Sequence, residues 1–139
     1  MIQGVIERWH RIVQGDDPGG LDTLLADDVV FYSPVVFTPQ RGKAIAKLYL
    51  QAAANTFSGG GGSNDLSHSP FRYTKEVLAR HQAVLEFETE LEGKYVNGVD
   101  IIECNDEGRI VEFRVMIRPL QAVNLLHAQM KAMLEKLGS

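Results

Sequence analysis

The sequence predicts an α+β fold, with helices before and after one curved antiparallel sheet. Apolar residues recur at three- and four-residue steps in residues 2–13 and 42–57, which is the spacing of an amphipathic helix. Residues 71–118 instead contain four stretches with the alternation, or the β-branched and aromatic content, of strands. Helical spacing returns over residues 120–137. Helices and strands in separate parts of a chain are typical of a sheet that carries its helices on one face.

Length and composition indicate a single domain over residues 1–139, with a core in residues 1–119 and a C-terminal helix at residues 120–137. A chain of 139 residues that is 45% hydrophobic and 23% charged is typical of one globular domain. The net charge of -4 and the lack of a Lys/Arg cluster argue against nucleic acid or an anionic membrane as a partner.

Cysteine content and hydropathy predict a cytoplasmic protein. Cys104 is the single cysteine, so an intrachain disulfide is impossible. No stretch has the length and apolar character of a signal peptide or a membrane-spanning helix.

The first two helices are predicted from their ends. Trp9 lies at the centre of the apolar face of the first helix, which Gly15 can terminate. The Asp17-Pro18 pair offers a cap and a first turn for a short second helix, which we expect to end at Asp27 and Asp28.

A short strand and a third helix follow. Residues 29–32 are β-branched and aromatic, and Ser33-Pro34 interrupts them, so residues 35–37 form either a second short strand or a loop. The third helix leads into a glycine-rich run at residues 58–64, which we expect to be a flexible connection because no Gly-Lys-Ser/Thr follows it.

The four strands of the sheet are expected to follow one another as antiparallel neighbours. Alternation is sharpest in the second of them, where glutamates occupy one face and apolar residues with one threonine occupy the other. The predicted strands are residues 71–79, 83–91, 95–103 and 109–118.

The last hairpin contains one acid, Asp100, among apolar neighbours. A four-residue turn at residues 105–108 would pair Asp100 with Phe113 on an apolar face, with Gly108 at the position that needs a positive φ. A three-residue turn would pair it with Arg114, because a shift of one residue exchanges the two faces of a strand. The four-residue turn puts apolar residues on the outer face as well, which predicts a partner subunit there. Those outer residues are Val99, Ile101, Ile110 and Met116.

Three sequence stretches resemble the nuclear transport factor 2-like, or SnoaL-like, superfamily. They are GDDPGGLDTLLADDVVFYSP at residues 15–34, RGKAIAKLY at residues 41–49 and GVDIIECNDEGRI at residues 98–110. The resemblance covers residues 1–119. It implies a cone-shaped, strongly curved sheet wrapped around the N-terminal helices, a central cavity, and pairing of two copies sheet to sheet. The superfamily includes ketosteroid isomerases, polyketide cyclases and limonene epoxide hydrolases, so the fold alone does not define an activity.

The resemblance to ketosteroid isomerases is partial. Their oxyanion-hole acid stands eight residues before the glycine of the last hairpin turn, as Asp100 stands before Gly108. Their general base precedes the proline after the first strand, where this chain has Ser33. Their helix tyrosine falls near Arg8 or Trp9. The usual isomerase mechanism is therefore not expected.

The resemblance to epoxide hydrolases and cyclases is also partial. Epoxide hydrolases need inward acids where this chain has Phe87, Thr89 and Val115, so their mechanism is not expected either. Polyketide cyclases use an aspartate and a histidine across the cavity, and His10 is the nearest histidine to offer.

Asp100 is the predicted polar anchor or acid, because burial among apolar side chains raises the pKa of a carboxyl group. Its possible catalytic partners are His10, Ser33 and Tyr32. A structural role, with the carboxyl satisfied by a backbone amide, by Trp9 or by Arg114, is the alternative. The ligand-binding residues are predicted to be Trp9, Tyr49, Phe57, Leu85, Phe87, Phe113, Val115 and Ile117, of which the first three fit plain core better than pocket wall.

Two functions follow from these expectations. The first is a homodimeric protein that binds a small apolar or carbonyl-bearing ligand, with isomerase-, cyclase- or dehydratase-like chemistry at Asp100 if it is an enzyme. The second is a non-enzymatic interaction or scaffold module with a vestigial cavity. The histidines show no metal-ligand spacing, so neither a metal nor another cofactor is expected.

Overall fold

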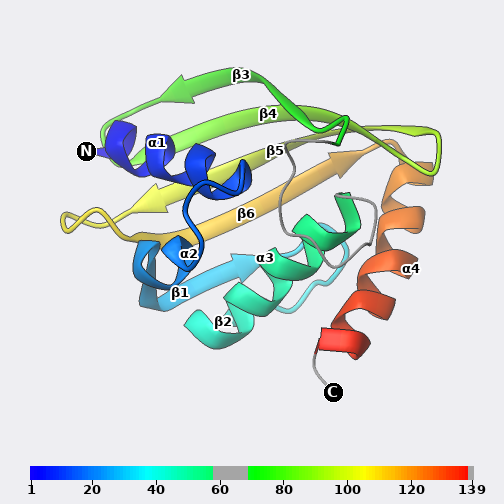
Figure 1. Ribbon diagram of the computed structural model, residues 1–139, viewed down its shortest axis with the longest axis horizontal. Helices are drawn as coiled ribbons and strands as arrows, with labels where there is room; N and C mark the ends of the chain where they lie inside the picture. The colour runs from blue at the N-terminus through cyan, green and yellow to red at the C-terminus, as the bar shows by residue number, and fades with distance from the viewer. Residues whose placement is uncertain (58–68, 138–139) are drawn as a thin grey trace.

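The computed structural model describes residues 1–57 and 69–137, which form four helices and six strands (Figure 1). The glycine-rich connection expected at residues 58–64 lies outside the described residues. In chain order the elements are α1 (Ile2–Val13), α2 (Gly20–Leu24), β1 (Leu25–Tyr32), β2 (Gln40–Arg41), α3 (Lys43–Phe57), β3 (Arg72–Leu78), β4 (Gln82–Leu91), β5 (Lys94–Cys104), β6 (Ile110–Arg118) and α4 (Leu120–Leu137).

The strands form one curved sheet in the order β2-β1-β6-β5-β4-β3, which confirms the α+β fold. The four strands of the C-terminal half are sequential and antiparallel, as predicted. The pairing of β1 with β6, which is parallel, was not predicted from the sequence. Figure 1 shows α1, α2 and α3 in front of one face of the sheet, with α4 at one end.

The second helix is shorter than predicted. It ends at Leu24, and its N-cap is Gly19 at φ 78 rather than Asp17. Asp27 and Asp28 do not end the helix but lie exposed within β1. The strand begins earlier than expected because Leu25 already pairs with Ile110 of β6. Residues 35–37 form no strand, so the loop alternative is correct.

The last hairpin has a register that neither turn length alone predicts. Asp100 pairs with Val115, not with Phe113 or Arg114. The backbone N–H of Asn105 donates to the Arg109 carbonyl at 2.9 Å, so the connection holds three residues. A bulge at Val111 then adds one residue to β6. The three-residue turn and the bulge together leave Asp100 on the same face as Phe113. This is the face that the four-residue turn predicted.

The bulge at Val111 also changes which residues lie on the outer face of the sheet. Ile110 was expected there, but it pairs with Cys104 and is fully buried in the core. Val84, Tyr95 and Met116 are 36%, 49% and 51% exposed on the strands, so the outer face does carry uncovered apolar residues.

Two apolar clusters fill the inner face of the sheet. The first lies beneath α1, whose Ile2, Val5, Ile6 and Trp9 are buried against it. In the second, Ala122, Leu126 and Met130 of α4 pack on α3 and on the far ends of β4 and β5. None of the helices in the described residues is long and apolar enough to cross a membrane.

Candidate functional site

A cavity of about 520 Å³ lies between the inner face of the sheet and the helices. Its volume is within the range of small-molecule sites. Most lining residues are apolar, and several are aromatic. The lining consists of Trp9, Ile12, Val13, Gly15, Asp17, Pro18, Gly19, Leu21, Phe31, Lys47, Leu50, Gln51, Ala53, Ala54, Phe57, Phe71, Tyr73, Phe87, Asp100, Phe113 and Val115.

A chain of three polar side chains crosses the wall of this cavity. Trp9 Nε1 donates a hydrogen bond of 2.9 Å to the Tyr73 hydroxyl, which in turn donates one of 2.6 Å to Asp100 Oδ2. Because an indole nitrogen can only donate, Trp9 fixes the Tyr73 oxygen as an acceptor and directs its hydrogen to Asp100. Among the described residues Asp100 has no second hydrogen-bond partner, so Oδ1 is available to a ligand.

Burial governs the charge of these three hydrogen-bonded side chains. Asp100 is 5% exposed, and burial raises its pKa to about 7, although the hydrogen bond from Tyr73 acts in the opposite direction. Burial also raises the pKa of Tyr73 well above its ordinary value, and the neighbouring Asp100 raises it further. The site therefore contains a neutral phenol and a carboxyl group that exchanges its proton near neutral pH.

Two local features shape the wall of the cavity around Tyr73 and Asp100. Thr74 is an extra residue in β3, a bulge that sets Tyr73 opposite Phe87 on the inner face. Gly98 of β5 pairs with Phe87, and a Cβ at Gly98 would lie 2.5 Å from the Phe87 ring. The Phe87 ring therefore occupies the space above Gly98.

Sequence reasoning did not identify Tyr73. A regular β3 would have placed it on the outer face, opposite Glu88, so counting from the turn cannot find it. The available signal was the pair Phe71 and Tyr73, aromatic residues two apart between polar ones.

Several predicted ligand-binding residues lie together on this cavity. They are Trp9, Phe57, Phe87, Phe113 and Val115, and Asp100 lies with them. Three others do not line it. The Tyr49 ring packs 5.6 Å from that of Phe31, Leu85 is fully buried beside Asp100, and Ile117 packs in the cluster beneath α4.

The three suggested catalytic partners are engaged elsewhere. His10 Nε2 lies 2.7 Å from Glu76 Oε1, in a second, more open hollow between α1 and β3. Ser33 Oγ accepts from the backbone N–H of Val35 at 3.2 Å. The Tyr32 ring lies 3.8 Å beneath the guanidinium of Arg114. Of these partners, none hydrogen-bonds to Asp100 in the part of the chain that the structure describes.

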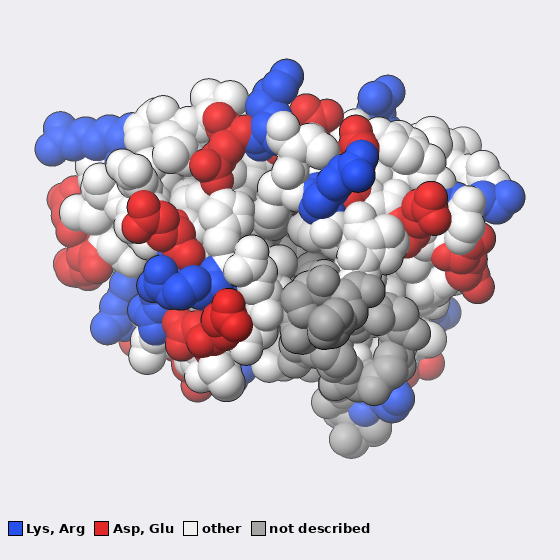
Figure 2. Space-filling model, turned by 45° about the horizontal axis from the view of Figure 1, so that its top comes forward, with Lys and Arg blue, Asp and Glu red and all other residues white. Residues whose placement is uncertain are grey.

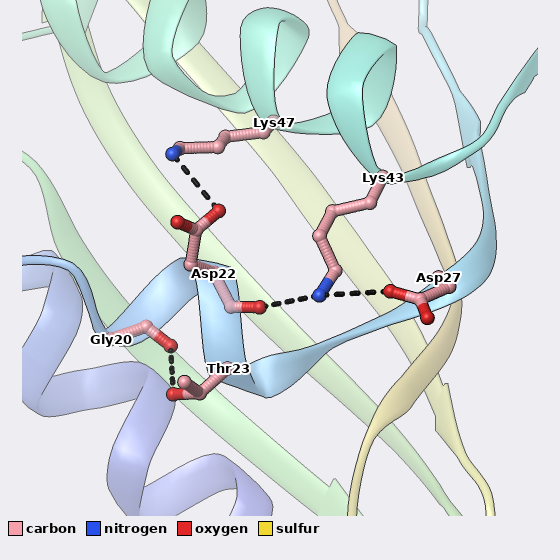
Figure 3. A network of polar contacts seen from close by, with 6 residues as sticks. All are labelled: Gly20, Asp22, Thr23, Asp27, Lys43 and Lys47. Atoms are coloured by element: carbon pink, nitrogen blue, oxygen red, sulfur yellow. Dashed lines mark hydrogen bonds and ion pairs between the residues drawn. The ribbon is translucent and has the colours of Figure 1, made fainter.

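Charges near the cavity are paired. Figure 3 shows Lys47 reaching Asp22 Oδ1 at 3.0 Å, while Lys43 binds the Asp22 carbonyl and the Asp27 carboxylate. On the face in Figure 2, basic and acidic side chains are interspersed over the described residues. This face has no extended surface of one sign, so it exerts little long-range attraction on a charged ligand.

The geometry supports one kind of chemistry. Protonated Asp100 can donate a hydrogen bond through Oδ1 to an acceptor oxygen, and such a bond is strong between apolar walls. The lining contains one other carboxylate, Asp17, which is held by Arg8 at 3.2 Å. The arrangement therefore provides a hydrogen-bond donor or general acid, with no second free carboxylate among the described lining residues.

Comparisons with known proteins agree with the resemblance seen in the sequence. The model of the SnoaL-like domain family matches residues 6–113. A steroid delta-isomerase from Pseudomonas aeruginosa is 27% identical, with a TM-score of 0.84 over 99% of this chain and 94% of that chain. A protein with a cystatin-like fold from Silicibacter pomeroyi, described as uncharacterized, is 28% identical, with a TM-score of 0.78 over 92% of this chain and 83% of that one.

More distant structures share the fold alone. The epoxide hydrolase/cyclase-like enzyme SalBIII, described as having a role in pyran ring formation in salinomycin, is 16% identical. Its TM-score is 0.59 over 84% of this chain and 89% of that chain. No functionally curated protein matches the sequence.

Proposed function

Because the chain belongs to the SnoaL-like domain family, we propose that its cavity binds a small, mainly apolar molecule whose carbonyl oxygen accepts a hydrogen bond from Asp100. The Tyr73–Asp100 bond of 2.6 Å, at the wall of an otherwise apolar cavity of about 520 Å³, carries this proposal. Apolar walls with a few converging polar groups are typical of sites that bind and orient one small molecule.

Catalysis at this site would use Asp100 as a general acid. A neutral carboxyl group can stabilise negative charge that develops on a carbonyl oxygen. The similarity to a steroid delta-isomerase supports stabilisation of this kind at a ligand carbonyl. Abstraction of a proton from carbon is not part of the proposal, because Ser33 stands where a base is expected and its hydroxyl accepts a backbone hydrogen bond.

The test uses Trp9, the single tryptophan of the chain, which lines the cavity. Its fluorescence should change on titration with 2-decanone, a neutral methyl ketone. For the wild type, affinity should fall above about pH 7, as Asp100 loses the proton that it donates.

Two variants of Asp100 make the test specific. Asp100→Asn should bind the ketone equally from pH 5 to about pH 9, because Tyr73 donates to the amide oxygen and leaves the N–H₂ facing the ligand. Asp100→Leu should bind about tenfold more weakly at low pH, since it offers no donor. Equal binding by all three proteins would overturn the role of Asp100. A cavity that binds no lipophilic probe would favour a scaffold module.

We also propose that the protein forms a homodimer through the outer face of the sheet. The exposed apolar residues Val77, Val84 and Met116 share this face with Glu86 and Arg114, so two copies can bury the former and pair the charges. Light scattering should give twice the mass of one chain, and Met116→Lys should give the mass of a monomer. A monomeric wild type at about 0.1 mM would refute this interface.

A further inference from the structure

The cavity has a second polar region at its rim, formed by Asp17, Lys47 and Gln51. The side chains of Asp17 and Lys47 are 30% and 32% exposed, whereas Asp100 as a whole is 5% exposed. One polar group therefore lies deep among apolar walls, and a separate group lies where the cavity meets solvent.

The rim presents hydrogen-bond donors from α3. Lys47 and Gln51 are four residues apart, so they share one face of the helix, together with the lining residue Ala54. The Lys47 ammonium has three hydrogens and uses one on Asp22. No described residue forms a hydrogen bond with the Gln51 carboxamide. Both side chains can therefore donate to an acceptor that enters the cavity.

The one carboxylate among the described rim residues is already engaged. Asp17 Oδ2 accepts from Arg8 Nε at 3.2 Å, and its carboxyl group lies so close to Gly20 that a Cβ there would be 2.4 Å from it. The Asp17 carboxylate is thus packed against the start of α2, and the guanidinium of Arg8 offsets its charge. It does not oppose an anion beside Lys47.

The present partner of Lys47 is easily replaced. The Asp22 side chain is 57% exposed, and ion pairs in contact with solvent add little stability. A ligand carboxylate at the rim could accept from both Lys47 and Gln51, whereas the Asp22 carboxylate accepts from Lys47.

We propose that the ligand of this protein is bifunctional: it carries a carbonyl oxygen that meets Asp100 and, at its other end, a carboxylate that Lys47 and Gln51 bind. This inference rests on the proposed function, because it requires a ligand in the same cavity. It narrows the ligand class from apolar carbonyl compounds to oxo acids with an apolar middle.

A matched pair of probes tests it. 2-Decanone and 9-oxodecanoic acid share the methyl ketone and the chain, and differ only in the terminal methyl or carboxylate. At about pH 6, where the acid is ionised, Trp9 fluorescence should show the wild type binding the oxo acid about fivefold more tightly. Lys47→Met should bind the two probes equally.

Lys43 provides the control. It lies on the same helix and also contacts Asp22, but it does not line the cavity (Figure 3). Lys43→Met should keep the fivefold preference, and Asp100→Leu should weaken both probes alike. A wild type that binds the ketone but shows no preference for the oxo acid would overturn the inference and leave the proposed function intact. Binding of neither probe would overturn both.

Discussion

The hydroxyl of Tyr73 lies 2.6 Å from Asp100 Oδ2, and this bond joins the edge strand β3 to β5 across the intervening β4. On β4, Phe87 pairs with Tyr73 and its ring packs over Gly98, while Leu85 pairs with Asp100. The bond thus links an edge strand, otherwise mostly exposed, to the centre of the sheet. It does so at the point where the cavity has its deepest polar group.

Tyr73→Phe should destabilise the protein by about 1 to 3 kcal/mol. The change leaves Trp9 Nε1 and Asp100 without the partner that each now has, and unpaired buried polar groups carry this cost. Urea unfolding at about pH 6 measures it. Tyr95→Phe, at a position that is 49% exposed, should change the free energy of unfolding by less than about 0.5 kcal/mol. Similar losses of unfolding free energy in both variants would show that the buried hydrogen bonds of Tyr73 do not stabilise the fold.

Stability should fall with rising pH through the titration of Asp100. Its pKa is about 7 in the folded protein and 3.8 for the free group, so the folded state holds a proton that the unfolded state has released. The stabilisation is complete below about pH 4 and is lost as the pH rises through 7, roughly 4 kcal/mol in all. Asp100→Asn lacks this dependence. Unfolding curves from pH 5 to about pH 8 should show the free energy of unfolding of the variant rising relative to that of the wild type. A difference that stays constant with pH would contradict the assignment.

Filling the cavity should block it. Ala54→Phe adds a ring to a lining position on α3, so binding of 2-decanone should weaken by about tenfold or more while the protein stays folded. The matched control is Ala132→Phe on the exposed side of α4, away from the cavity. Trp9 fluorescence should show normal binding for the control. Undiminished binding by Ala54→Phe would place the probe elsewhere.

Gly98→Ala should be among the most damaging small substitutions. The added Cβ would lie 2.5 Å from the Phe87 ring and 2.6 Å from the Met116 carbonyl oxygen, which belongs to the backbone and cannot rotate away. A loss of about 3 kcal/mol in the free energy of unfolding is expected. Gly4→Ala has open space on an exposed turn of α1 and should stabilise by about 0.5 to 1 kcal/mol. Thermal unfolding of both variants checks the contrast.

The sequence predicted the helices and the four sequential strands to within a few residues. Their periodicity is a local property, and the inward position of Asp100 follows from a two-residue alternation that survives small errors of register. The pairing of β1 with β6 was not predicted, because it joins segments far apart in the chain and depends on the assembled sheet.

Bulges account for most of the remaining differences at the site. The bulge at Val111 moved Ile110 from the outer face into the core, and that at Thr74 turned Tyr73 towards Asp100. Neither has a glycine or proline to mark it, so alternation along the strand gives no warning. The predicted partner His10 contacts Glu76 instead, because the direction of a side chain at the end of a helix depends on how the helix docks.

The Thr74 bulge also bears on how relatives of this protein are aligned. A relative that lacks one residue at this point would have a regular β3 and would still present the residue equivalent to Tyr73 beside Phe87. A relative of equal length without the bulge would present the residue equivalent to Thr74. An ungapped alignment would then match residues that face opposite sides of the sheet. Within the SnoaL-like family, the group that meets the buried acid is therefore better identified by strand pairing than by sequence position.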